Sequence, residues 1–356
     1  MGVRPILPPK AEVRSSNPVG GEPLQSEPQR SQKKTVGDRH RPAFTMREPP
    51  QAGPEEIRCP FMTLVVGCAT PDIGFLVADT LLSFPFYLKG RTGPVNGENH
   101  ALKIQVLNAT TAVAFAGDVE ASLDLIHTLH AKLSADSMID PCEQLFASYH
   151  GLAARTSAPH CEFLVLQLAA RGKKLAQITR EGVFECDRAY IGDAAEYKRM
   201  KQLQRPRSAP AMRHVQQPDG TFSVVPLVQS EGEIQFEEIS AAMEALTHRR
   251  QSESVGAIAG CVTRVVDAQI SRELEYLQSV EVSVTPWEGN SGFSLLASNS
   301  GTRGIGIYYR SGKMGFLFVV GDREPCHKEA AETIKQFIEV ARARHGLNLV
   351  GGAWDQ

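Results

Sequence analysis

Four residues of this chain stand at the ends of consecutive strand-like runs. Thr63 opens the run TLVVGCA, and Asp79 closes the run IGFLVAD that follows it. Lys103 then opens KIQVLNA, and Gly117 closes TAVAFAG. The first two runs are expected to pair as one hairpin and the last two as another. If these hairpins stack, the strand ends that carry the four residues can converge at one edge.

These residue types match what a hydrolase needs when its nucleophile is the first residue of the mature chain. A threonine hydroxyl is a weak nucleophile until a base removes its proton, and a free α-amine with a pKa of about 7.7–8.0 can do this. A nearby lysine can share the proton, a buried carboxylate can hold that lysine, and backbone N–H groups can face the oxyanion. Taken singly, a strand-start Thr is usually structural, a strand-end Asp usually caps a turn, and a lone Lys is usually solvated.

The composition is that of an ordinary globular protein. The 356 residues are 42% hydrophobic and 22% charged, with a net charge of −2, so no global field attracts nucleic acid or a membrane. No apolar run approaches the roughly 20 residues of a membrane span, and no signal-peptide core is present. The seven cysteines are dispersed and never in C-x-x-C spacing, which predicts a reducing cytoplasm without a disulfide framework or zinc site. No metal or organic cofactor is expected.

The chain divides at residue 62. The first 61 residues contain 11 of the 22 prolines and no apolar periodicity. Such a segment cannot offset its ordering entropy by burying apolar surface, so residues 1–62 are predicted to be a disordered extension or propeptide. Residues 63–350 are predicted to form one domain.

Strand and helix signals alternate along this domain. Hairpins are expected at 63–69 with 73–79, 103–109 with 111–117, and 162–170 with 174–181, and single strands at about 280–285, 292–298, 304–309 and 315–320. Helices are expected at 119–133, at 142–154, from Ala194, and at about 237–249, 255–270 and 327–344. Hairpins alternating with helix pairs predict the α+β class, as two stacked sheets covered by helices on both outer faces, a four-layer αββα sandwich.

Two polar features have alternative interpretations. Residues 198–213 carry six basic side chains and no acidic one, and we interpret 198–232 as a solvated inserted loop rather than a nucleic-acid patch, because no aromatic residues are interleaved for stacking. His127 and His130 stand three residues apart on a predicted helix. Metal ligation is the alternative to a half-exposed helix face there, but no carboxylate or cysteine ligand is evident nearby.

The runs MTLVVG, GFLVADT, LKIQV and AVAFAGD together resemble the amino-terminal half of proteasome β-subunits and their bacterial relatives, within the N-terminal nucleophile (Ntn) hydrolase superfamily. Counted from Thr63 as residue one, Asp79 falls where that family keeps its catalytic carboxylate. The interval from Lys103 to Gly117 matches the interval from catalytic lysine to oxyanion-hole glycine. Residues 162–197 resemble the family's second hairpin and its Gly-Ser-Gly turn. The resemblance covers about 63–200 and continues weakly beyond.

The resemblance implies a role for each matching residue. Thr63 would be the nucleophile and, through its α-amine, a base. Lys103 would help to deprotonate the hydroxyl, and Asp79 would orient Lys103. The backbone N–H of Gly117 would stabilise the oxyanion. Asp193 aligns with the turn serine that steadies the terminal amine, and its carboxylate could pair with that amine, although the residue type differs.

The chain also departs from the family pattern. The segment between Asp79 and Lys103 is longer than usual, which makes Lys89 a rival lysine. Phe84, Phe86, Tyr87 and Leu88 in this segment are an apolar lip of the pocket in one interpretation, although such side chains more often belong to a core. Asp267, on the predicted helix 255–270, is a weaker candidate for the family's supporting carboxylate, because the expected SGG does not follow it. The insertions 198–232 and 271–279 mean that ring assembly does not transfer, although a homo-oligomer is expected by resemblance.

The amine of Thr63 acts only if the residues before it are absent. Either Met62 is the true start and is removed, or 1–62 is a propeptide cleaved by Thr63 itself. The sequence therefore predicts a cytoplasmic threonine-type amide hydrolase acting on a peptide or amide, without nucleic acid or membrane. The alternatives are an Ntn amidohydrolase acting on a small amide and a catalytically silent, proteasome-like structural subunit.

Overall fold

The computed structural model describes much of the chain from Thr63 onward. Its described ranges are residues 63–80, 100–154, 159–169, 172–206, 212–216, 222–226, 229–248, 262–268, 272–282, 292–310 and 312–350. All of them belong to one compact unit, Ile57–Asp355. The predicted extension 1–62, Lys89 and the apolar lip of residues 84–88 lie outside the described residues.

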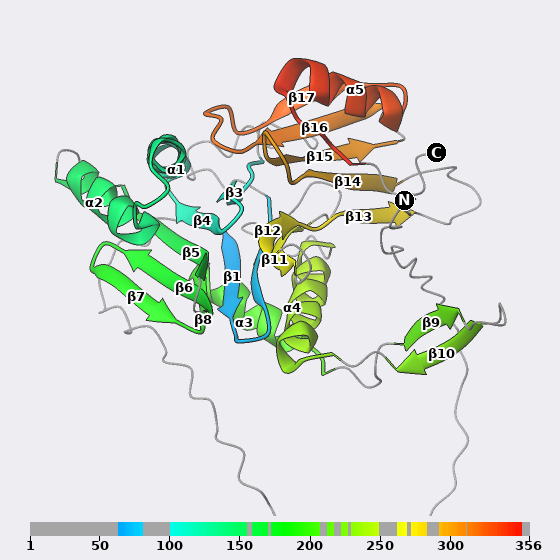
Figure 1. Cartoon of the computed structure of the whole chain (residues 1–356), viewed down its shortest axis with the longest axis horizontal. Coiled ribbons are helices and arrows are strands. Elements are labelled where there is room, and N and C mark those ends of the chain that lie inside the picture. The colour runs from blue at the N-terminus through cyan, green and yellow to red at the C-terminus, as the bar shows by residue number, and fades with distance from the viewer. Residues whose placement is uncertain are drawn as a thin grey trace, which may run out of the picture. The chain divides into compact units, whose positions relative to one another are not determined.

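Two five-stranded sheets contain the strands that the sequence analysis emphasises (Figure 1). The first sheet has the order β12-β11-β2-β1-β8, built from β1 (Leu64–Ala69), β2 (Gly74–Ala78), β8 (Arg188–Gly192), β11 (Thr263–Ala268) and β12 (Glu273–Tyr276). The second sheet has the order β3-β4-β5-β6-β7, built from β3 (Ile104–Asn108), β4 (Thr111–Gly117), β5 (Cys161–Ala169), β6 (Gly172–Thr179) and β7 (Gly182–Cys186). Each predicted hairpin is therefore present as an antiparallel pair, β1–β2, β3–β4 and β5–β6.

A third five-stranded sheet was not predicted. Its order follows the chain, from β13 (Ser279–Val282) through β14 (Gly292–Ser298), β15 (Gly304–Tyr309) and β16 (Met314–Val319) to β17 (His327–Ala330). A separate two-stranded sheet pairs β9 (Met212–Gln216) with β10 (Phe222–Pro226). Every pair of named strands within the described ranges is antiparallel.

Five helices are described: α1 (Val119–Ala135), α2 (Pro141–Ala153), α3 (Ala194–Leu203), α4 (Glu231–His248) and α5 (Ile334–His345). The first three begin directly after an aspartate whose carboxylate accepts backbone N–H groups of the first turn, at Asp118, Asp140 and Asp193. Such caps satisfy donors that have no partner within the helix. The prediction of mixed helices and antiparallel sheets is thus confirmed.

Alternate residues of β1 enter two different apolar cores. Val66 packs in one core with Met200 of α3 and Met243 of α4. Val65, on the opposite face of the strand, belongs to the larger core that also contains Leu164 of β5. The hairpin β1–β2 is therefore buried on both faces, which explains why TLVVGCA and IGFLVAD are almost continuously apolar.

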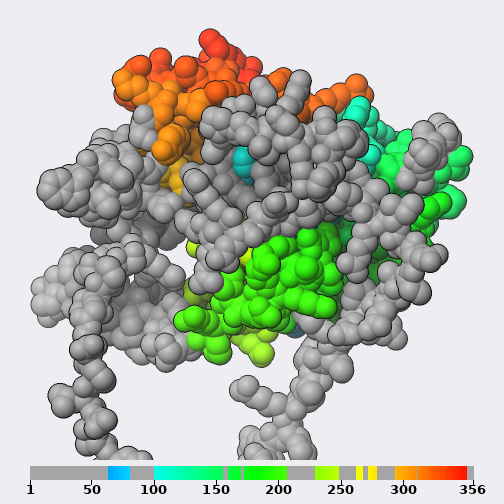
Figure 2. All heavy atoms as spheres, turned by 180° about the vertical axis from the view of Figure 1, so that it is seen from behind, coloured from blue at the N-terminus to red at the C-terminus, as the bar shows by residue number. Residues whose placement is uncertain are grey.

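The third sheet has its own core against α5. Phe337 of α5 packs with Tyr308 and Leu317, and this part of the chain, in orange to red, lies at the surface in Figure 2. The strands predicted at about 280–285, 292–298, 304–309 and 315–320 correspond to β13, β14, β15 and β16, whereas the last strand, β17, was not predicted. The predicted helix 327–344 is wrong before Ile334, because His327–Ala330 pairs with β16 and the helix begins only after its N-cap, Thr333.

Two other predictions are corrected. The predicted helix 255–270 is wrong over residues 263–268, where Thr263, Val265 and Val266 form strand β11. Their branched side chains fit a pleated sheet better than a helix. Within the predicted loop 198–232, the described residues include the end of α3, the pair β9–β10 and the start of α4, so the loop prediction is wrong for those elements. No helix among the described residues is long and apolar enough to span a membrane.

Tyr276 joins the first sheet to the second. Its buried hydroxyl donates to the carbonyl of Ile104 at 2.8 Å and accepts the N–H of Val106 at 2.9 Å. Both acceptor and donor belong to β3, next to an irregularity in the β3–β4 register after Val106. One side chain therefore satisfies two backbone groups just after Lys103.

Replacing Tyr276 with Phe should destabilise the protein by about 3 kcal/mol, because two buried backbone groups lose their partner. Tyr308→Phe is the matched control, since the buried Tyr308 hydroxyl makes one such bond, to the carbonyl of Ala331 at 3.0 Å. We expect a loss of about 1 kcal/mol there. Urea unfolding of both variants measures the difference, and equal losses would contradict the bridging role of Tyr276.

Candidate active site

Thr63 lies directly before β1, between the ends of two strands. It is 7% exposed, and its carbonyl accepts the N–H of Asp193 at 2.8 Å. The strand that it precedes pairs with β2 on one side and β8 on the other, with Leu64 opposite Gly192. The start of β1 is thereby fixed by main-chain pairing on both sides.

Asp79 and Lys103 form an ion pair beside Thr63. Lys103 Nζ lies 2.8 Å from Asp79 Oδ1, and both side chains are fully buried. The same oxygen accepts the N–H of Leu64 at 3.2 Å, the first amide after Thr63. A single carboxylate oxygen therefore connects the lysine to the backbone of the proposed nucleophile.

The burial of Lys103 has an electrostatic consequence. Removal from water disfavours the ammonium and lowers the pKa of Lys103, while the charge of Asp79 and the hydrogen bond that Lys103 donates to its carboxylate act in the opposite direction. The result is a pKa below the ordinary value for lysine. Such an amine exchanges a proton with a neighbouring hydroxyl more readily near neutral pH than a solvated lysine does.

Gly117 lies on the strand adjacent to Lys103. The N–H of Phe115 donates to the carbonyl of Lys103 at 3.1 Å, which places Lys103 opposite β4 two residues before Gly117. Gly117 has a φ of 100°, and a Cβ there would stand 2.1 Å from the carbonyl oxygen of His160. No other residue fits this position without displacing the backbone. The oxyanion role of its N–H stays a prediction.

Asp193 contacts Thr63 through its backbone. Its Oδ1 caps α3, accepting the N–H groups of Ala195 at 2.8 Å and Glu196 at 3.1 Å. The contact described with Thr63 is the main-chain bond to the Thr63 carbonyl. The structure therefore brings all five predicted residues to neighbouring strand ends, while pairing between the Asp193 carboxylate and the amine stays a prediction.

Gly192 was missed by the sequence analysis, although it precedes the capping Asp193. It has a φ of 95°, and a Cβ there would stand 1.9 Å from the carbonyl oxygen of Thr63. The turn after β8 can approach Thr63 this closely only with glycine. A glycine directly before a helix cap was the signal available in the sequence.

His100 was also missed. Its Nδ1 lies 3.1 Å from Thr80 Oγ1, and the N–H of Ala101 donates to the Thr80 carbonyl at 2.9 Å. His100 is 5% exposed. Burial, and the charge of Lys103, lower the pKa of His100 to about 4, so the ring is neutral at pH 7. No periodicity or motif in the sequence marks this contact.

Asp267 does not belong to this group. It lies on β11, and its Oδ2 is 3.1 Å from Lys173 Nζ. In the register of the first sheet Val266 stands opposite Phe75, at the far end of β2 from Asp79. The predicted supporting role for Asp267 on a helix is therefore wrong.

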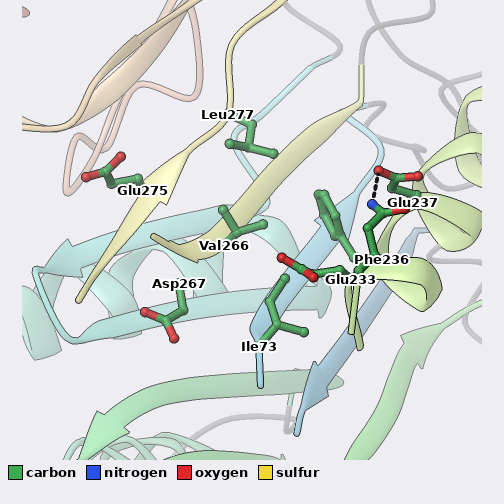
Figure 3. A pocket seen from close by; sticks show the side chains of 9 residues that line it. Ile73, Glu233, Phe236, Glu237, Val266, Asp267, Glu275 and Leu277 are labelled. Atoms are coloured by element: carbon green, nitrogen blue, oxygen red, sulfur yellow. Dashed lines mark hydrogen bonds between the residues drawn. The ribbon is translucent and has the colours of Figure 1, made fainter. Parts of the chain in front are cut away.

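Asp267 instead lines a hollow of about 320 Å³ (Figure 3). Its lining combines apolar side chains with acidic ones: Ile73, Gln229, Glu233, Phe236, Glu237, Val266, Asp267, Glu275 and Leu277. Ile73 precedes β2 and Asp79 follows it, so the hollow lies about 20 Å along the strand from the ion pair. The hollow is thus separate from the site at Thr63.

The histidines of α1, His127 and His130, lie outside this group of residues. His127 Nδ1 lies 2.5 Å from the carbonyl oxygen of Gly321, and burial lowers the pKa of His130. Within the described ranges, no group of three or more His, Cys, Asp or Glu side chains is placed to hold a metal ion. The arrangement around Thr63 offers a hydroxyl, an amine and a carboxylate, which suit acyl transfer.

No protein-family model matches this sequence, and a search of curated proteins gives no match either. The interpretation of the site therefore rests on its own geometry and on the resemblance of its motifs.

Removing one member of the ion pair should cost more than removing both. Lys103→Met deprives the buried Asp79 carboxylate of its ammonium, and we expect a loss of about 3–5 kcal/mol in unfolding free energy. Adding Asp79→Asn to Lys103→Met should restore more than about 1 kcal/mol of that loss. Chemical denaturation of the single and double variants measures the coupling, and simple additivity would show that the pair does not interact.

His100 should make the stability depend on pH. Its pKa is about 4 in the folded protein and about 6.5 when unfolded, so the unfolded state binds a proton first as the pH falls. The stability due to neutral His100 is complete above about pH 6.5 and is lost progressively down to about pH 4. The difference between the two pKa values corresponds to about 3 kcal/mol.

His100→Asn is the control, because an amide can replace Nδ1 in the contact with Thr80 but does not titrate. The unfolding free energy of both proteins is measured between pH 4 and pH 7. The native protein should lose stability more steeply than the variant. Parallel curves would mean that His100 is not buried as a neutral ring.

Proposed function

We propose that this chain is a threonine-type N-terminal nucleophile amide hydrolase, a proteasome-like peptidase whose nucleophile is Thr63. The observation that carries the proposal is the shared carboxylate oxygen of Asp79, which accepts from both Lys103 Nζ and Leu64 N. This bond pattern ties a lysine of lowered pKa to the first amide after the nucleophile. A threonine that only begins a strand does not need a buried lysine and carboxylate beside its backbone.

The packing of the helices supports the same proposal. α3 and α4 contribute to the core on one face of β1, and the core on its other face includes residues of β5. That second core also includes Ile126 of α1 and Leu145 of α2. We therefore infer a four-layer αββα arrangement for the first two sheets and these helices. The third sheet with α5 is an addition to the arrangement that the resemblance implies.

The proposed reaction begins once Thr63 has a free α-amine. Thr63 Oγ attacks the carbonyl carbon of the substrate amide, while its proton passes to the α-amine, with Lys103 favouring the transfer. The backbone N–H of Gly117 donates to the oxyanion of the tetrahedral intermediate. The C–N bond then breaks, the leaving amine takes the proton, and an ester to Thr63 remains. Water attacks this ester, which releases the acid and restores the hydroxyl.

Asp79 acts in this scheme through Lys103. Its carboxylate holds the ammonium, and its bond to Leu64 N keeps the start of β1 in position. No step requires a metal or organic cofactor. The five described cysteines are free thiols, which agrees with the proposed cytoplasmic location. A homo-oligomer is proposed by resemblance alone.

The central experiment compares chains that differ only at the nucleophile. A chain beginning at Met62 should lose that methionine and expose the Thr63 amine, which intact mass and N-terminal sequencing verify. It should hydrolyse members of a fluorogenic peptide-amide library. Thr63→Ala in the same chain should reduce turnover to background, whereas Thr63→Ser should retain part of it, because a hydroxyl remains.

Each outcome selects one of the functions considered. Turnover that persists in Thr63→Ala would refute the proposal. Activity confined to small amides in a parallel panel would assign the protein to the Ntn amidohydrolases. A correctly folded chain with a free Thr63 amine and no activity on either panel would favour a silent structural subunit, for which the low exposure of Thr63 is one indication.

A further inference from the structure

Glu162 makes a hydrogen bond that connects the two sheets near Thr63. It is the second residue of β5, half-buried, and its Oε2 accepts the N–H of Gly192 at 2.9 Å. Glu162 belongs to the second sheet and Gly192 ends β8 at the edge of the first. The bond therefore does not belong to any strand ladder.

Gly192, the residue that Glu162 binds, lies directly against Thr63. A Cβ at Gly192 would stand 1.9 Å from the Thr63 carbonyl oxygen, so the backbone of this turn lies directly against Thr63. The next amide, that of Asp193, donates to the same carbonyl at 2.8 Å. Any movement of the turn would thus move Thr63 or break this bond.

The backbone of Glu162 pairs with β4, the strand that ends at Gly117, the proposed oxyanion donor. In the β4–β5 register Glu162 pairs with Ala116, and the next pair is Cys161 with Gly117. A Cβ at Gly192 would also lie 3.5 Å from Ala116 Cβ. Glu162 is therefore anchored beside Gly117 and bonded to the turn that holds Thr63.

A carboxylate is well suited to this contact. Hydrogen bonds from an amide to an ionised acceptor are shorter and stronger than neutral ones. The accepting oxygen also lies close to the start of α3, whose N-terminal end favours negative charge.

We propose that Glu162 is a positioning residue, which holds the Gly192 turn against Thr63 and so fixes the nucleophile relative to the Gly117 amide. This inference rests on the proposed function of Thr63 for its catalytic consequence. Its structural part, the restraint of the turn, can be tested independently of activity. A displacement of about 1 Å in a reacting group is enough to lower turnover about 10²-fold.

Three substitutions separate reach from charge, each made in the chain that begins at Met62. Glu162→Gln keeps the length and an acceptor oxygen, Glu162→Asp keeps the charge but is shorter by one methylene, and Glu162→Ala has neither. Glu185→Ala is the matched control, because Glu185 lies on β7 of the same sheet in an exposed pair with Lys174. Unfolding midpoints verify that each variant is folded.

We expect kcat to fall about 10–100-fold in Glu162→Ala and Glu162→Asp, with KM changed less than about 3-fold, because binding is retained while the nucleophile is displaced. Glu162→Gln should stay within about 3-fold of the native kcat, and Glu185→Ala should be unchanged. If Glu162→Ala does not fold, the kcat of Glu162→Asp compared with that of Glu162→Gln tests the positioning role. A loss of kcat in Glu162→Gln as large as in the other variants, with the exchange rate of the Asp193 amide unchanged, would mean that the charge acts on the reaction directly, and would overturn the positioning role.

Hydrogen exchange at the Asp193 amide supplies the readout that does not need activity. This amide should exchange at least about 10-fold faster in Glu162→Ala and Glu162→Asp than in the native chain or Glu162→Gln. If the native chain and Thr63→Ala are equally inactive, the proposed function fails while exchange still decides whether Glu162 restrains the turn. Unchanged exchange in Glu162→Asp would overturn the inference.

Discussion

The buried ion pair of Asp79 and Lys103 constrains the arrangement of the strands around it. Neither side chain is exposed to solvent, and removing two charges from water is costly unless they meet at hydrogen-bonding distance. Here the separation is 2.8 Å, and Leu64 N supplies a further bond to the same carboxylate oxygen. A shift of β1, β2 or the start of β3 by one residue would separate these groups. The pair therefore selects one register among those that apolar pairing alone would allow.

Several residues outside the ion pair also hold the surrounding strands in position. Tyr276 binds two backbone groups of β3 just beyond Lys103, which keeps this edge strand in place. Gly117 and Gly192 both adopt positive φ values at points where another backbone segment approaches too closely for a side chain. These contacts come from strands that are distant in the sequence, so the geometry at Thr63 is a product of the assembled sheets rather than of any one hairpin.

The sequence predicted those parts of the structure that depend on local signals. The hairpin at Thr63 has two apolar runs around a Thr-Pro-Asp turn, and the helix after Gly117 has a clear apolar stripe, so both could be recognised. Asp79 and Lys103 could be chosen because each stands at the end of a run. Residues 263–268 were misassigned because the helical pattern of the preceding residues continues into them, while sheet pairing with β2 prevails in the structure. The contacts of Glu162 with Gly192 and of His100 with Thr80 join residues 30 and 20 positions apart, and nothing in their local pattern indicates them.

Thr80 forms hydrogen bonds with both His100 and Ala101. These bonds bring together the two ends of the segment that separates Asp79 from Lys103. Because this closure is made by residues adjacent to the ion pair, the number and kind of residues between the two anchor points can change at a modest cost in loop entropy. Variation in residues 81–99 is thereby decoupled from the ion pair. Related proteins could exchange this segment, and with it whatever the segment contacts, while keeping the same reactive groups in the same positions.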